Sequence, residues 1–364
     1  MKQNSQGPGS YLDWAATAPL HPAARLAMAE AAERLSAGVW ANPSSVHGPG
    51  RAARRALAVA REAVAAFFAV PADSVIFTSG GTEALFLALD GADHNVRLLG
   101  ATEHPAVLQA APDATILAVD GNGQVQLPAA IPEGALVAIQ HANNETGVVQ
   151  DLGAIAATLH RAGARLVADC VQSAGKLPLP PADFIAISGH KLGGPAGIGA
   201  LLVRCKDGFG AVQKGGGQEQ GFRGGTENLL GAIGLAAALQ AYDHDFPARA
   251  FRLRDRLEGG AMALGARING AGSPRIPSVS SIHTPGLPAA TQLMQLDMAG
   301  VAVSQGSACS SGTLKPSPVL EAMGLHQAAS QSLRVSTGWT TTEADIDRFL
   351  DSFGQLLRRA HRAA

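Results

Sequence analysis

The sequence predicts an α/β protein in which a parallel or mixed sheet is covered by helices on both faces. Short apolar runs alternate with longer, alanine-rich amphipathic runs along the 364 residues. Polar and glycine-rich motifs follow several apolar runs directly, at the strand ends where such sheets bind ligands. After about residue 245 the pattern changes to a helix (248–264) and shorter strands, so we expect a second, smaller domain.

The elements of the sheet are predicted in chain order. Residues 51–68 place arginines on one face and Ala, Leu, Val and Phe on the other, which is typical of a surface helix. A strand is expected at 74–79, and a helix begins at "GTEALFLAL". The later strand candidates are 135–140, 164–169, 183–188 and 199–204. The apolar stretch 229–242 is too short to span a bilayer and is expected to be a buried helix.

Composition and charge exclude several classes of protein. A formal net charge of −1 does not provide the basic surface that nucleic acid needs. Three cysteines without paired spacing favour a reducing compartment and give no metal-binding pattern. The start "MKQNSQGPGSYLDW" lacks the apolar core of a signal peptide. We expect a soluble, cytoplasmic protein that binds neither nucleic acid nor a membrane.

The segment "VIFTSGGTEAL" combines a strand, a glycine turn and the start of a helix. Free backbone N–H groups and the positive end of the helix dipole meet there, which suits a phosphate. Thr82 would add a hydroxyl, and Glu83 lies in the first turn, where a carboxylate also caps a helix. The same pattern occurs in any strand–turn–helix unit, so phosphate binding is one of two interpretations.

Two charged residues follow later strands. Asp169 ends an apolar strand, with Gln172 three residues further on, and either anchors a protonated ring nitrogen or caps a loop. Lys191 lies in a glycine-bounded turn between two apolar strands. A lysine in such a low-dielectric place can lose its proton and form a Schiff base, although a lysine can also extend to the surface.

Other polar residues collect after strands and in one C-terminal segment. His104, His141, Asn143, Asn144 and Glu145 are each as consistent with a structural role as with a functional one. In "VAVSQGSACSSGTLKPS" (301–317), by contrast, Cys309 is surrounded by small polar residues that could not bury a thiol. Reactive cysteines occur where a thiolate can meet solvent, so the segment predicts a nucleophile.

Together these motifs resemble the cysteine desulfurases, pyridoxal-phosphate enzymes with the fold-type I architecture of class V aminotransferases. The resemblance covers nearly the whole chain, in the family's order. It rests on "YLDWAATAPLHP", "NPSSVHGPGRAAR", "FTSGGTEA", "EHPAV", "NNETGVVQD", "ADCVQSAGK", "SGHKLGGPAGIGAL", "GGGQEQGFRGGTEN", "SQGSACSSG" and "SLRVSTGWTTTEADID". "RGGTEN" and "GSACSSG" are similar to the group that supplies sulfur for iron–sulfur clusters or nitrogenase.

The resemblance implies a large domain (16–245) with a mainly parallel, seven-stranded sheet. Residues 1–15 and 246–364 would form a smaller α+β domain that carries the cysteine loop. It also implies a homodimer with shared active sites, because Thr226 matches a residue that reaches the neighbouring subunit. A sulfur acceptor or iron–sulfur scaffold protein would be a further partner.

The resemblance assigns roles residue by residue. Lys191 matches the lysine that binds pyridoxal 5′-phosphate covalently, and Asp169 the partner of its pyridine nitrogen. Gln172 would bond the ring hydroxyl, and His104 would stack on the ring and move protons. The residues implied to hold the phosphate are Gly81, Thr82, Ser188, His190 and Thr226.

The substrate would be L-cysteine. Asn144 and Arg334 match the residues that bind its carboxylate, Arg334 through a bidentate fork. Cys309 would take the sulfur as a persulfide and leave L-alanine, a task that suits a loop able to reach the substrate and then an acceptor. The family often has alanine at Gly81 and lysine at Ala196, and neither difference removes required chemistry.

Two alternatives remain open at this point. A selenocysteine lyase or another class V aminotransferase or epimerase would share Lys191 and Asp169, and Cys309 separates them because transamination needs no thiol. A relative that only binds sulfur-assembly proteins would lack Lys191, Asp169 or Cys309, and all three are present.

Overall fold

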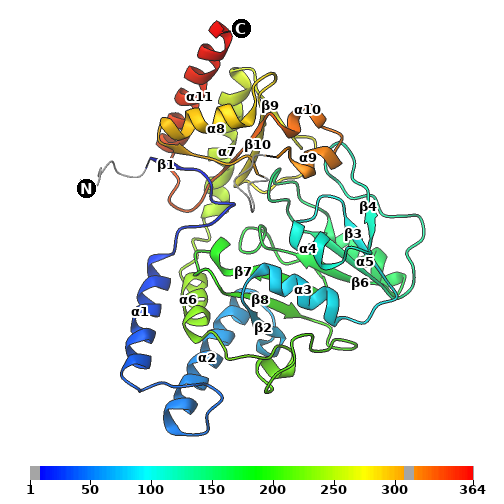
Figure 1. The fold of residues 1–364 in the computed structure, drawn as a ribbon, viewed down its shortest axis with the longest axis vertical. Coiled ribbons are helices and arrows are strands. Elements are labelled where there is room, and N and C mark those ends of the chain that lie inside the picture. The colour runs from blue at the N-terminus through cyan, green and yellow to red at the C-terminus, as the bar shows by residue number, and fades with distance from the viewer. Residues whose placement is uncertain (1–8, 307–314, 364) are drawn as a thin grey trace.

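A seven-stranded sheet forms the centre of the larger part of the molecule (Figure 1). The computed structural model describes residues 9–306 and 315–363. In spatial order the strands are β2 (Val75–Thr78), β8 (Gly199–Val203), β7 (Phe184–Ser188), β6 (Arg165–Asp169), β5 (Ala135–Gln140), β3 (Val96–Gly100) and β4 (Thr115–Leu117). Neighbours from β7 to β4 pair in parallel, whereas β8 is antiparallel to both β7 and β2. The predicted mainly parallel sheet is confirmed.

The central strands are apolar along their whole length because helices cover both of their faces. In β5 every residue is buried, with Val137 and Ile139 on one face and Leu136 and Ala138 on the other. Burying one such Leu, Val or Ile side chain stabilises the fold by about 1.5–3 kcal/mol. A run buried on both faces shows no polar alternation, which is why the sequence signal there was a continuous apolar stretch.

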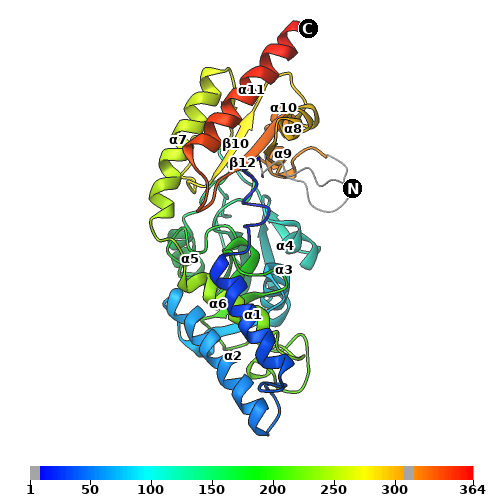
Figure 2. The ribbon, with the colours of Figure 1, turned by 90° about the vertical axis from the view of Figure 1, so that its left-hand side faces the viewer.

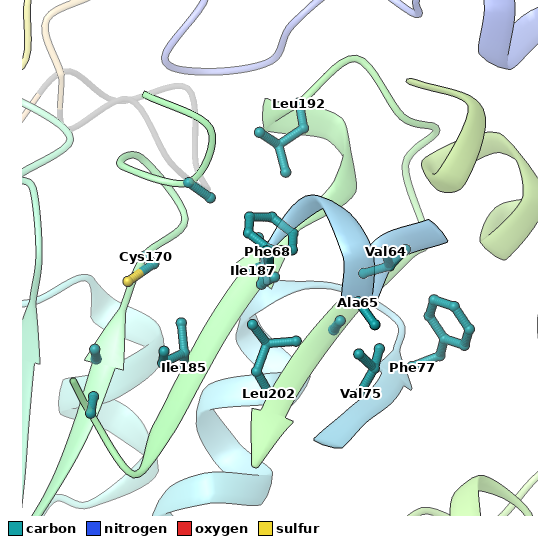
Figure 3. Close-up of a cluster of buried hydrophobic side chains, with 14 of the residues drawn as sticks. Val64, Ala65, Phe68, Val75, Phe77, Cys170, Ile185, Ile187, Leu192 and Leu202 are labelled. Atoms are coloured by element: carbon teal, nitrogen blue, oxygen red, sulfur yellow. The ribbon is translucent and has the colours of Figure 1, made fainter. Parts of the chain in front are cut away.

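One face of the sheet is covered by three helices, α2 (Gly48–Phe67), α5 (Leu152–Arg161) and α6 (Leu229–Gln240). Val64, Ala65 and Phe68 at the end of α2 belong to the same buried cluster as Ile185 and Leu202 of the sheet (Figure 3). α1 (Pro22–Ser36) packs on α6 from outside. The apolar α6 is buried as predicted, and none of the described helices is long and apolar enough to cross a membrane.

The opposite face is covered by α3 (Gly81–Gly91) and α4 (Pro105–Ala110). The predicted helices and strands of this part lie within a few residues of their expected ranges. Three short 3-10 turns complete it: η1 (Ala72–Ser74), η2 (Gly189–Lys191) and η3 (Glu219–Gly221).

The C-terminal residues form a second layer with the N-terminal strand. An antiparallel sheet has the order β12 (Ser332–Ser336), β10 (Val279–His283), β9 (Arg267–Ile268), and β1 (Ser10–Tyr11) pairs in parallel with β11 (Val301–Ala302). The helices are α7 (Phe246–Ala263), α8 (Ala289–Met298), α9 (Pro318–Ala322), α10 (His326–Ala329) and α11 (Glu343–Ala363). α7 and α11 lie side by side in both views (Figures 1 and 2). This layer has its own core, which includes Leu12, Leu257, Ile282, Phe349 and Phe353.

Candidate active site

A cavity of about 290 Å³ opens at the carboxyl ends of the central strands, where they face β12. Its lining contains ten of the twelve residues to which the resemblance assigns a role: Gly81, Thr82, His104, Asn144, Asp169, Gln172, Ser188, His190, Lys191 and Arg334. Asp169 ends β6 and Ser188 ends β7, and parallel strands bring both ends to one edge of the sheet. Polar residues far apart in the chain therefore meet in one place.

Of the two other predicted residues, Thr226 lies outside this cavity and Cys309 is not among the described residues. Thr226 lines a separate surface pocket with Leu35, Ala41 and Asn228, away from the cavity of its own chain. Cys309 belongs to 307–314 and is outside the described residues. Gly306, the last described residue before that segment, lines the cavity.

The turn between β2 and α3 forms one end of the cavity. Gly81 opens the eleven-residue helix α3, so its backbone N–H groups face the cavity as an anion site requires. A Cβ at Gly81 would lie 2.6 Å from Cγ2 of Val171, which leaves no room for the alanine that the family often has there. At Gly81 the turn therefore presents backbone atoms without a side chain, and a phosphate would approach the backbone closely.

Glu83 braces this turn. Its carboxylate accepts the backbone N–H of Ser79 and forms an ion pair with Arg223, with Nε 2.7 Å from Oε1. Burial alone would raise the pKa of Glu83, but the hydrogen bonds from Arg223 and Ser79 hold it below its ordinary value. Glu83 thus fixes Ser79, the residue before the N-cap, whereas the N-cap residue Gly80 has no side-chain cap.

Lys191 and Asp169 share the middle of the cavity. Nζ of Lys191 donates hydrogen bonds to the carbonyls of Ala15 and Ala16, both at 2.6 Å. Asp169 is buried, and Oδ1 accepts the N–H of Val171 at 2.9 Å. Burial raises the pKa of Asp169, opposed by that hydrogen bond and by His104 and Lys191, so a cation placed against it would restore the charged form.

Two histidines flank this pair. Nδ1 of His104 accepts the N–H of Ala106 at 3.1 Å and caps α4, so the neutral ring carries its proton on Nε2. Burial lowers the pKa of His104, Asp169 opposes the shift and Lys191 adds to it. Burial also lowers the pKa of His190 to about 4, and its Nδ1 lies 3.1 Å from Oγ1 of Thr17. Both rings are neutral at physiological pH.

Two residues that line the cavity each have one buried polar atom without a hydrogen-bond partner among the described residues. Gln172 donates from Nε2 to the carbonyl of Ala15 at 2.9 Å, while its Oε1 is buried and unpartnered. Nε of Arg334 is buried and unpartnered as well. A buried polar group without a partner costs about 1–3 kcal/mol, so both side chains have unused hydrogen-bonding capacity beside the cavity. The donor set and the glycine cradle fit pyridoxal phosphate with its substrate.

Arg334 connects three parts of the chain. Its Nη2 donates to Oδ1 of Asp13 at 2.7 Å, its Nη1 donates to the carbonyl of Asn144 at 3.1 Å, and its side chain is 5% exposed. Asn144 thus contacts the arginine through its backbone, while the residue itself also lines the cavity. Arg334, for which the resemblance implies binding of a carboxylate, therefore lines the cavity with one side of its fork already contacted by the carboxylate of Asp13.

The sequence analysis missed two carboxylates at the site. Asp13 lines the cavity, and its only local signal was its place two residues after the N-terminal β-strand. Glu103 is buried directly before His104, and its Oε1 accepts the N–H of Gln140 at 2.8 Å. Burial raises the pKa of Glu103 well above its ordinary value. No three or more His, Cys, Asp or Glu residues of the described chain are grouped as a metal site.

Comparisons with known proteins agree with this geometry. The family model "Aminotransferase class-V" matches residues 10–349. A cysteine desulfurase of Cereibacter sphaeroides is 39% identical, over 94% of either chain, and an IscS-like cysteine desulfurase of Mycobacterium tuberculosis is 37% identical over 98% of either chain. A solved NifS-like protein superposes with a TM-score of 0.86 at 27% identity, covering 97% of this chain and all of that one.

The fold and the cavity define a class V aminotransferase, and the chain belongs to that family. Its named relatives place it, within the family, among the cysteine desulfurases. The resemblance read from the motifs and the predicted fold class are both confirmed.

Proposed function

We propose that the protein is a cysteine desulfurase that uses pyridoxal 5′-phosphate to convert L-cysteine into L-alanine and a persulfide on Cys309. The observation that carries the proposal is the convergence of Lys191, buried Asp169 and buried Arg334 on one cavity. A chain with these three groups and Cys309 has an amine, an acid, an anion site and a nucleophile. An aminotransferase would need no thiol, so Cys309 favours the desulfurase over that alternative.

Different residues of the cavity would contact different parts of the cofactor. Lys191 would bind it covalently, and Asp169 would keep its ring nitrogen protonated. Gln172 would use its unpartnered amide oxygen toward the ring hydroxyl, and His104 would stack on the ring. Gly81, Thr82, Ser188 and His190 would hold the phosphate. When bound, the cofactor supplies an electron sink for negative charge at the α-carbon of the substrate.

The protein groups then perform the steps around the substrate. Arg334 would bind the substrate carboxylate, with Asn144 beside it, and the amine of Lys191, once free, would accept the α-proton. The thiolate of Cys309 forms a bond to the substrate sulfur as the bond from that sulfur to the β-carbon breaks. The electron pair of the broken bond stays with the carbon skeleton, which is protonated to alanine.

The proposal includes a homodimer. Thr226 lies outside the cavity of its own chain, which is what we expect of a residue that contributes to the active site of a neighbouring subunit. Apolar side chains in and near the first two helices are open to solvent, among them Leu26 in α1, Val46 and, in α2, Val59. A second copy would cover them. A sulfur acceptor or scaffold protein for iron–sulfur clusters completes the proposed partners, and a cytoplasmic location stays a prediction.

We further infer the division into a large domain of 16–245 and a small domain of 1–15 and 246–364. The separate core around Phe349 and Phe353, which includes Leu12 from the N-terminus, supports this division.

The proposal is tested by product analysis. Wild type, Cys309→Ser and Cys205→Ser, a second cysteine that is partly exposed, are incubated with L-cysteine, pyridoxal phosphate and a thiol reductant. Equal amounts of alanine and sulfide are expected from wild type and Cys205→Ser, and neither from Cys309→Ser. Full activity of Cys309→Ser would refute the nucleophile. Selenide from selenocysteine without sulfide from cysteine would favour the selenocysteine lyase.

A further inference from the structure

Glu145 is a buried carboxylate that the proposed reaction does not use. It follows β5 in a turn braced by Asn143, whose Oδ1 accepts the N–H groups of Glu145 at 2.9 Å and Thr146 at 2.8 Å. Glu145 is 5% exposed, and burial raises its pKa, opposed by Ser317 and Arg334. The side chain therefore projects from a fixed turn into the protein, and its place there requires an explanation.

One partner of Glu145 is the start of α9. Oε2 of Glu145 accepts the hydroxyl of Ser317 at 2.5 Å, and Ser317 is fully buried. The same hydroxyl oxygen accepts the N–H of Leu320 at 3.0 Å and caps α9. The backbone N–H of Ser317 donates to the carbonyl of Ala329 at 2.8 Å. The chain is thus fixed at the point where residues 315–317 enter α9.

The other neighbour of Glu145 is Gly306. A Cβ at Gly306 would lie 3.0 Å from Cγ and Oε2 of Glu145, so the backbone of Gly306 packs directly on the carboxylate side chain. Gly306 also has φ = +94°, in the left-handed region that favours glycine. Next to it, Nε2 of Gln305 donates to the carbonyl of Lys315 at 3.0 Å and ties the two chain segments together.

Glu145, Gln305, Gly306 and Ser317 form what we call the clasp. It joins residues 304–306 to residues 315–317, which flank the segment 307–314 in the sequence. The clasp adjoins the cavity, because Gly306 and Ser304 line it and Ser304 exchanges backbone hydrogen bonds with Arg334 at 2.6 and 3.1 Å.

The position of the clasp bears on chemistry in the cavity. Three peptide links span at most about 11 Å, so the Cα atom of the third residue beyond Gly306 stays within that radius of it. A catalytic group that is displaced by about 1 Å can lose roughly a hundredfold in rate. Fixing Gly306 therefore fixes the origin from which Cys309 must reach the substrate.

We propose that Glu145 is a positioning residue for sulfur transfer, which holds both ends of 307–314 together at the cavity. This inference rests on the proposed function, in which Cys309 takes the sulfur. Among the described residues, Glu145 contacts the hydroxyl of Ser317 and the backbone of Gly306, and the charge of Arg334 acts on it from further away. The clasp therefore needs a hydrogen-bond acceptor of this shape at position 145. Glutamine keeps the acceptor and the shape, whereas alanine removes both.

The test compares Glu145→Ala, Glu145→Gln and a control, Glu258→Ala. Glu258 is also buried, is paired with Arg275 at 2.6 Å and does not line the cavity, so its loss destabilises the fold without touching the clasp. Hydrogen exchange of peptides covering 304–306 and 315–320 is measured by mass spectrometry on the holoenzyme. The cofactor absorbance change on adding L-cysteine, KM and kcat are measured on the same samples.

In Glu145→Ala we expect exchange in both peptides to rise at least tenfold and kcat to fall at least tenfold. KM and the absorbance change should stay as in wild type, because the cavity itself is intact. Glu145→Gln should restore slow exchange and most of kcat. Glu258→Ala should unfold at lower urea concentration with kcat unchanged.

Other outcomes would overturn the inference. If hydrogen exchange in Glu145→Ala were the same as in wild type, Glu145 would not hold residues 304–306 and 315–317 together. Equal loss of kcat and of bound cofactor in both Glu145 variants would show that Glu145 acts by its charge inside the cavity. Faster exchange with an unaltered kcat would make Glu145 a structural anchor only. If wild type forms no alanine from L-cysteine, the proposed function itself fails, and the exchange data separate that result from a failure of the clasp.

Discussion

Replacing Gly81 by alanine should loosen the turn between β2 and α3, because the added methyl group would clash with Val171. The added Cβ would lie 2.6 Å from Cγ2 of Val171, closer than side chains tolerate. Valine has one strongly preferred rotamer in most settings and cannot swing aside freely. Overpacking of this kind costs about 1–3 kcal/mol. If the turn moves to avoid the clash, its backbone N–H groups no longer point toward the phosphate of the cofactor. A loss of about 1.4 kcal/mol in binding free energy would weaken cofactor binding tenfold.

The assay is a double-mutant cycle on Gly81→Ala and Val171→Ala. Apoproteins are unfolded in urea, and each is titrated with pyridoxal phosphate by absorbance. We expect Gly81→Ala to be destabilised and to bind weakly, and the double variant to recover most of both losses, since the two sites are in direct contact. Additive effects, or a Gly81→Ala protein as stable and as tightly binding as wild type, would refute the packing argument.

Three further changes have definite expected outcomes. Arg334→Lys removes the planar fork that faces the cavity, so KM for L-cysteine should rise tenfold or more in steady-state kinetics, in line with about 1.5–3 kcal/mol for a charged hydrogen bond. Glu219→Ala breaks a buried bidentate pair with Arg61 (2.6 and 2.8 Å), so urea unfolding should show a loss of about 3–5 kcal/mol. A loss below about 1 kcal/mol would contradict the buried pair. Glu103→Gln tests a raised pKa: folded Glu103 keeps its proton, while the unfolded chain releases it above about 4.5. The stabilisation that comes from this tighter hold on the proton is complete below pH 4.5 and is lost as the pH rises through the pKa of folded Glu103. The free energy of unfolding of wild type should therefore fall relative to that of Glu103→Gln as the pH rises. Parallel curves of unfolding free energy against pH for the two proteins would contradict the raised pKa.

Much of the site could be predicted because its residues follow recognisable strands. β5, β7 and β8 are buried on both faces, so their sequences are continuous apolar runs with clear ends. Parallel pairing then brings polar residues after those ends to one edge. β3 and β4 were not predicted, because Arg97 places a charge within β3 and β4, at the edge of the sheet, is only three residues long.

Other features depend on neighbours that are remote in the chain. Asp13 reaches Arg334 across 321 positions, and no local pattern shows that the two will meet. Glu103 and Glu145 are ordinary carboxylates in the sequence and become unusual only through burial. Thr226 was assigned from resemblance alone, and the structure places it on the surface of its own chain.

The most direct test of the account is to locate the sulfur after one turnover. The holoenzyme is mixed with one equivalent of L-cysteine without reductant, quenched and digested, and the peptides that contain Cys170, Cys205 and Cys309 are weighed by mass spectrometry. We predict one added sulfur atom on the Cys309 peptide alone, in proportion to the alanine formed. Alanine without added sulfur on Cys309, or with the sulfur on Cys205, would contradict the assignment of Cys309 as the residue that takes the sulfur.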